Sequence, residues 1–189
     1  MNTTIETAHD DLTLGNREGW TMAHEAACNR GDLPEGFDKW DVSDKNGCSI
    51  AHMAAIYGNL PSNFDQWELA DNRGRTVAHE AARRGSLPAE FDRWEMADEY
   101  GRTVAHEYVN HGGSFPATST LWTMADITGW TVAHAAITHA HGLPMDFDLW
   151  EMSTLNGRTV AEAYTRYHEI PAGFDWIGLH QQPLPGLPF

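Results

Sequence analysis

The chain contains few basic residues, few cysteines and no long apolar segment. It has 12 lysines and arginines against 27 aspartates and glutamates, which gives a formal net charge of -15. This balance argues against generic binding to nucleic acid or to an anionic membrane. No run approaches the roughly 18 consecutive apolar residues that a transmembrane helix needs. The first residues have neither the basic region nor the apolar core of a secretory signal peptide, so we expect none.

Cysteine occurs only as Cys28 and Cys48. Their spacing matches neither a metal site nor a disulfide framework, and neither has a partner set that would make it a nucleophile. Two isolated cysteines predict a reducing, intracellular setting, with the cytoplasm as the localisation. The sequence also contains no GxSxG, no P-loop and no GxGxxG motif. We therefore expect no enzyme and no cofactor.

What the chain does contain is one segment repeated six times. A glycine recurs every 27 or 28 residues, at Gly19, Gly47, Gly74, Gly101, Gly129 and Gly157. Two residues after each glycine stands Thr or Ser, and three residues further on stands His, which Glu162 replaces in the last copy. An apolar–Pro pair and the motif FDxW follow, although the fourth copy keeps only Trp122 of that motif. Six copies in register predict a repeat architecture.

Each copy carries the local signals of two short helices. The Thr or Ser is placed to cap a first helix, and VAHEAARR consists of good helix formers. Gly85 is placed to end that helix in a left-handed conformation. Pro88 suits the first turn of a second helix, in which AEFDRW would put Phe and Trp on one face.

The stretch DNRGRTVAHEAARRG, from Asp71 to Gly85, resembles the first half of an ankyrin repeat. The period is shorter than the roughly 33 residues of that family, so the second helix must be shorter. The resemblance implies an all-α, ankyrin-like helical-repeat solenoid of about six helix-turn-helix units with terminal caps. We expect one domain over residues 1–189, with an N-terminal cap at 1–16, six repeats at 17–177 and a Pro-rich tail at 178–189.

The in-register histidines are expected to be structural, because a catalytic site is not built by repeating one residue along a rod. These positions are His24, His52, His79, His106 and His134. The resemblance implies that each imidazole bonds the nearby hydroxyl or turn backbone and ties one repeat to the next. A metal site at His111, His139 and His141 is conceivable, since imidazole binds zinc or nickel. No cysteine or carboxylate completes a recognised spacing there, so we expect surface histidines and no metal.

Candidate binding residues are those that differ between copies at the turn tips and helix ends, which line the concave face of ankyrin-like stacks. Aromatic residues and arginines are enriched at binding hot spots. The candidates are Trp20, Tyr57, Arg73, Arg75, Arg83, Arg84, Tyr100, Arg102, Trp130 and Tyr167. The five arginines form a basic island that suits an acidic partner surface or a phosphate. The alternative interpretation is that they balance nearby carboxylates.

These observations favour a non-enzymatic, monomeric scaffold that binds a partner protein through its concave face. That partner would carry an acidic patch or be a nucleic-acid-binding protein, and we expect no membrane partner. One alternative is an acidic inhibitor of a nucleic-acid-binding enzyme, of the phage anti-defence or bacterial effector type, acting in the host cytoplasm. Direct binding of a phosphate ligand or nucleic acid at the arginine island is less favoured, and a metal-dependent enzyme at the His111 edge is favoured least.

Overall fold

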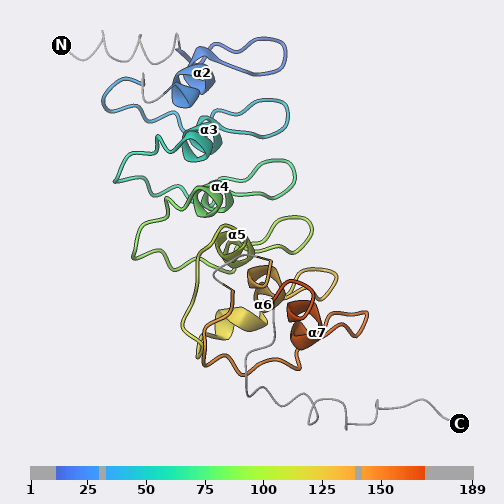
Figure 1. The fold of residues 1–189 in the computed structure, drawn as a ribbon. Helices are drawn as coiled ribbons and strands as arrows, with labels where there is room; N and C mark the ends of the chain where they lie inside the picture. Colours follow the sequence, from blue (N-terminus) through green and yellow to red (C-terminus); the bar gives the residue numbers. More distant parts are fainter. Residues whose placement is uncertain (1–11, 30–32, 139–141, 169–189) are drawn as a thin grey trace, which may run out of the picture.

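The computed structural model describes residues 12–29, 33–138 and 142–168. Within them lie the α-helices α2 (Met22–Cys28), α3 (Ile50–Tyr57), α4 (Val77–Arg84), α5 (Val104–Asn110), α6 (Val132–Ala136) and α7 (Val160–Tyr164), and the 3-10 helix η1 (Thr120–Thr123). Each α-helix packs against the next in chain order. Figure 1 shows α2 to α5 as a column from which α6 and α7 step sideways. The loops before the helices project to one side of this column, and the loops after them project to the other.

The predicted helix-turn-helix units are wrong. Within the described residues each repeat has a single α-helix of five to eight residues, and AEFDRW forms a turn and an extended segment instead of a second helix. The amide of Phe91 closes one turn onto the carbonyl of Pro88 at 3.1 Å, and the chain then extends. A second helix over AEFDRW would be so short that its few hydrogen bonds would not offset the cost of nucleating it. The all-α solenoid of six such units is therefore not the fold.

The extended FDxW segment has another role, because it caps the helix that follows it. The first amides of a helix have no partner within the helix. In α4 the amide of Val77 donates to the carbonyl of Leu69 at 2.9 Å, and that of Ala78 donates to Trp67 at 3.2 Å. Equivalent bonds precede α3, α5 and α7. The carbonyls that a second helix would need internally are thus bound to the next helix.

The FDxW rings form a continuous aromatic ladder along the connecting loops. Phe91 lies 5.1 Å from Trp94, which lies 5.0 Å from Phe115 of the next unit, both edge to face. The same alternation joins Phe37, Trp40, Phe64, Trp67, Phe91, Trp94, Phe115, Trp122, Phe147 and Trp150. Edge-to-face pairs add to the stabilisation that burial of the rings provides. The sequence motif therefore builds contacts between units rather than a helix face.

On the opposite side, a loop leads into each helix, and we call these the tip loops. Each is closed by an isolated antiparallel β-bridge, between residues 15/21, 43/49, 70/76, 97/103, 125/131 and 153/159. In the third loop Oδ1 of Asp71 accepts the amides of Arg73 and Arg75 at 2.8 and 2.9 Å. The amide of Glu99 in the following loop donates to the carbonyl of Arg73 at 2.8 Å. The tip loops are thus rigid and bonded to one another.

We expect alanine to be far more disruptive at Gly129 than at Gly157. Both glycines have a left-handed backbone, with φ of 78° and 77°. A Cβ on Gly129 would lie 2.6 Å from the amide nitrogen of Leu155 in the next tip loop, whereas a Cβ on Gly157 would meet none of the described residues within 4 Å. The left-handed strain costs about 1–2 kcal/mol at either site. The clash should add roughly 1–3 kcal/mol for Gly129→Ala alone.

Urea unfolding followed by circular dichroism measures both losses of stability. Gly157→Ala is the matched control, because it carries the same backbone strain without the neighbouring loop. Equal losses in the two variants would contradict the close contact between successive tip loops.

The fourth unit differs from its neighbours where the helices step out of line. Tyr108 occupies the helix position that is Ala81 in the previous unit, and its ring lies 4.9 Å from Trp94 and 5.2 Å from Phe115. A Cβ on Gly113 would lie 2.4 Å from this ring. The glycine therefore makes room for a side chain that joins the aromatic ladder between α5 and α6.

Candidate protein-binding surface

The five in-register histidines link successive units. Nδ1 of His79 accepts the amide of Thr76 at 3.0 Å and its hydroxyl at 2.8 Å, while Nε2 lies 3.0 Å from the carbonyl of Arg102 in the next unit. Equivalent bonds occur at His24, His52, His106 and His134. Since Nδ1 only accepts, the proton resides on Nε2 and is donated to the carbonyl.

The pKa of each of these histidines is lowered below its ordinary value, chiefly because burial disfavours the imidazolium. The hydrogen bond to the backbone carbonyl opposes this effect without cancelling it. Both ring nitrogens are engaged within the fold, so none of the five is free to act as a base or to bind a metal.

Three of the candidate tip residues pack against the scaffold itself. Trp20 stacks on His24 with ring centroids 4.9 Å apart, and Trp130 lies 5.0 Å from His134. Arg102 pairs with the buried carboxylate of Asp98 at 3.1 Å and lies 5.6 Å from the ring centroid of Tyr100. All three are half-buried, so they offer a partner only part of their surface.

Arg75 reaches from its tip loop into the helices. Its Nε donates to Oε1 of Glu80 at 2.9 Å, and its Nη1 donates to Oε1 of Glu107 at 2.8 Å. Both glutamates are buried, with 8% and 6% exposure. Burial alone would lower the pKa of Arg75, but the hydrogen bond to Glu107 and the charges of Glu80 and Glu107 raise it above its ordinary value. Arg75 therefore remains a cation fixed inside the protein.

Two further contacts extend from the Arg75 cluster toward the helix ends. Nη1 of Arg83 lies 3.9 Å from Oε2 of Glu80, and Nδ1 of His111 lies 3.8 Å from Oε2 of Glu107. We call these five residues the charged strip. It connects a tip loop with the C-terminal ends of α4 and α5.

The other candidates face solvent. Tyr57, Tyr100 and Tyr167 are 50%, 46% and 53% exposed. Arg73, Arg83 and Arg84 are exposed as well. The basic island therefore divides: Arg75 and Arg102 balance internal carboxylates, whereas Arg73, Arg83 and Arg84 remain at the surface.

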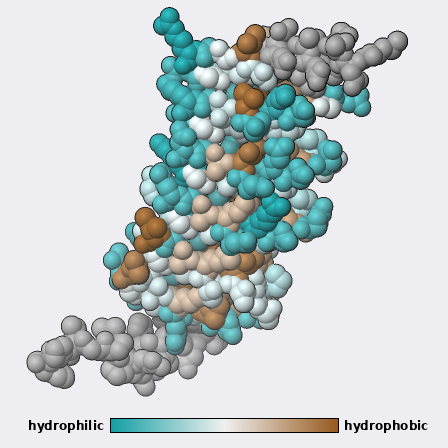
Figure 2. Space-filling model, turned by 180° about the vertical axis from the view of Figure 1, so that it is seen from behind, coloured by the Kyte–Doolittle hydropathy of each residue, from teal (hydrophilic) through white to brown (hydrophobic). Residues whose placement is uncertain are grey.

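The sequence interpretation missed the acidic partners of the island. Glu80 and Glu107 occupy the fourth helix position, where α3 has Met53 and α6 has Ala135. Glutamate in two adjacent units, next to Arg75, was the available signal. Exposed Ile127 and Leu155 were also missed, at 62% and 78% exposure. Figure 2 shows hydrophobic residues emerging at the lower left edge of an otherwise largely hydrophilic outline.

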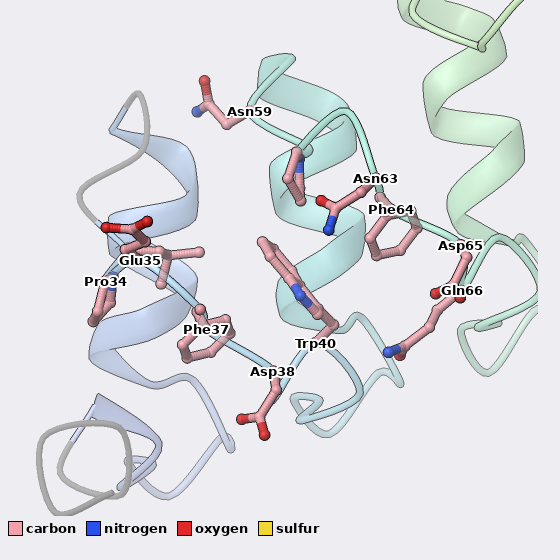
Figure 3. Close-up of a pocket in the computed structure, with 13 residues that line it drawn as sticks. Pro34, Glu35, Phe37, Asp38, Trp40, Asn59, Asn63, Phe64, Asp65 and Gln66 are labelled. Atoms are coloured by element: carbon pink, nitrogen blue, oxygen red, sulfur yellow. The ribbon is translucent and has the colours of Figure 1, made fainter. Parts of the chain in front are cut away.

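The connecting loops of the first two units enclose a groove of about 770 Å³. The rings of Phe37, Trp40 and Phe64 lie along it in Figure 3. Glu35 and Asp65 are among its lining residues and are exposed. We call it the acidic groove.

The two cysteines are not disulfide-bonded. Burial is the main cause that raises the pKa of Cys48 to about 12, and burial also raises that of Cys28. A protonated thiol is a poor nucleophile. In the described part of the chain no three His, Cys, Asp or Glu side chains are grouped to hold a metal. His139 and His141 of the conceivable metal edge lie outside the described residues.

A search of the described residues finds no helix with the length and apolar character needed to cross a membrane. Comparison of the chain with models of known protein families and with curated proteins gives no match. The resemblance to ankyrin repeats thus depends on the motif residues alone.

Proposed function

We propose that this protein is a non-enzymatic, monomeric interaction protein that binds an acidic surface of a partner protein through its tip loops and helix ends. One observation carries the proposal: Arg83, at one end of the charged strip, and Arg84 beside it remain exposed, although the chain as a whole is strongly acidic. Exposed Tyr57 and Tyr100 add side chains of the kind that dominate binding hot spots.

The internal bonding of the repeated residues supports a scaffold rather than a catalyst. The histidines use both ring nitrogens to join units, and the thiols are held protonated. The motif resemblance to ankyrin repeats supports the same function, since that family binds proteins. Unpaired Cys28 and Cys48 suit a reducing compartment, and we propose the cytoplasm.

The test is a pair of charge-reversed proteins. Arg83→Glu/Arg84→Glu should lose the partner captured from host lysate, with affinity reduced at least about tenfold, because hot-spot side chains contribute about 2 kcal/mol or more each. Lys39→Glu/Arg93→Glu is the matched control: it changes the net charge equally, on the connecting loops. Quantitative mass spectrometry measures capture, and circular dichroism verifies folding. Unchanged capture by the first variant would contradict the proposal.

A second candidate is the acidic inhibitor of a nucleic-acid-binding enzyme, which the acidic groove favours. It requires the opposite outcome in the same assay. Arg83→Glu/Arg84→Glu would then retain the partner, and Glu35→Gln/Asp65→Asn would lose it. Affinity would also fall steeply with salt, since exposed charges separated by more than the Debye length of about 10 Å at 0.1 M are largely screened.

A further inference from the structure

A cavity of about 280 Å³ lies at the C-terminal ends of three successive helices. Its lining consists of Ile56 of α3, three residues of α4 (Glu80, Arg83 and Arg84) and His111, which follows α5. Its volume suits a single side chain with its adjacent backbone, because pockets for drug-sized ligands begin at roughly 300 Å³.

One wall of the cavity carries a buried acceptor that lacks a donor. Arg75 binds Oε1 of Glu80, but Oε2 is buried and has no hydrogen-bond partner among the described residues. Nη1 of Arg83 lies 3.9 Å from Oε2, which is beyond hydrogen-bond distance. An unsatisfied buried acceptor costs about 1–3 kcal/mol, so an N–H group placed there would be stabilising. The Arg83 side chain is 61% exposed, so it can move away to admit that group.

The rim of the cavity carries guanidinium donors. Arg84 forms no ion pair within the described residues, in contrast to Arg75 and Arg102. Its Nε lies 3.4 Å from the position of a Cβ on Gly58, so Arg84 lies against the residue that ends α3. A guanidinium binds a carboxylate through two parallel hydrogen bonds.

We infer that this cavity is the subsite for one acidic residue of the partner, whose carboxylate binds Arg83 and Arg84 while a neighbouring N–H donates to Oε2 of Glu80. The inference rests on the proposed function and assigns the chemistry of its contact. A phosphate monoester dianion offers acceptors alone, which the buried Glu80 carboxylate would repel. A lysine side chain would be repelled by the like charges of the two arginines at the rim.

The test titrates the ¹⁵N-labelled full chain with acetyl-tetraglutamate amide, acetyl-tetralysine amide and methyl phosphate in its dianionic form. The tetraglutamate peptide should shift the Arg84 Nε–H and His111 amide signals saturably, and Arg84→Gln should weaken binding at least threefold. Glu80→Gln should weaken it as well, since the carboxamide can place a second donor opposite the peptide N–H. If simple charge attraction governed binding, Glu80→Gln would instead strengthen it, because the substitution removes a negative charge.

A modified probe removes any dependence on how the variants fold. Tetraglutamate with N-methylated amides keeps its charge and loses its donors, so it should bind the wild-type protein at least threefold more weakly. Equal binding of the methylated peptide, or tighter binding by Glu80→Gln, would overturn the role of Glu80. Equal or stronger shifts with methyl phosphate or tetralysine would overturn the acidic-residue subsite. If no peptide binds while Arg83→Glu/Arg84→Glu still loses the host partner, the subsite is wrong and the proposed function stands.

Discussion

Trp122→Ala should cause the largest loss of stability of any single truncation in the aromatic ladder. The Trp122 side chain is fully buried and lies 5.7 Å from Phe115 and 5.8 Å from Phe147. Its Nε1 donates to the carbonyl of Pro116 at 2.9 Å. Removing a buried aromatic ring costs about 3–5 kcal/mol, and the carbonyl would lose its donor as well.

Urea unfolding measured by far-ultraviolet circular dichroism gives this loss without relying on tryptophan fluorescence. Trp67→Ala is the matched control, since Trp67 makes the same two kinds of ring contact but is only half-buried. Trp122→Phe should lie between wild type and Trp122→Ala, because it keeps a ring and removes the hydrogen bond. A loss for Trp122→Ala no larger than for Trp67→Ala would contradict the greater contribution expected of the fully buried ring.

Acidification should unfold the protein steeply, starting near pH 6.5. The five buried histidines are neutral in the fold, and their pKa values lie below the ordinary 6.5 that the unfolded chain has. The unfolded state therefore binds more protons, so stability is fully present above pH 6.5 and is lost as the pH falls toward the folded-state pKa values. Each histidine contributes a slope of at most about 1.4 kcal/mol per pH unit, and five together approach about 7 kcal/mol per pH unit.

The free energy of unfolding measured by urea titration between pH 7.5 and 4.5 tests this expectation. The Asp126 carboxylate titrates below this pH range and so does not add to the change expected from the histidines. Burial raises the pKa of Asp126, but hydrogen bonds from Thr128 and Trp130 bring it below its ordinary 3.8. His134→Gln should reduce the slope by about one proton, because the carboxamide does not titrate. A stability that stays flat from pH 7.5 to 5 would contradict the buried, neutral histidines.

Local structure follows the sequence best where a signal and its partner lie within a few residues. The predicted caps at Thr21, Ser49, Thr103, Thr131 and Thr159 each accept the amide three residues on. In α4 the amide of His79 donates instead to the carbonyl of Thr76. Gly58 and Gly85 end their helices in the predicted left-handed conformation. Such signals depend on local backbone geometry, which the residue types themselves constrain.

The predicted second helix does not form, because its helix signals are local whereas the contacts that favour the extended chain come from the next unit. Pro88 begins a single turn and not the predicted second helix. The chain then extends because the carbonyls of Trp94 and Met96 bind the first amides of α5. The rings of FDxW meet rings one unit away, such as Trp67 with Phe91. Short helices depend on such tertiary contacts more than on propensity.

The sequence by itself determined the period, the position of each helix start and the residue types that recur in register, because each follows from contacts within one repeat. The tertiary structure alone decided which arginines are free. Arg75 binds Glu107, 32 residues further along the chain, while Arg84 lies beside Gly58 of the preceding unit. Stacking of the units creates both neighbourhoods, and the charges of the surface that we propose for binding depend on them.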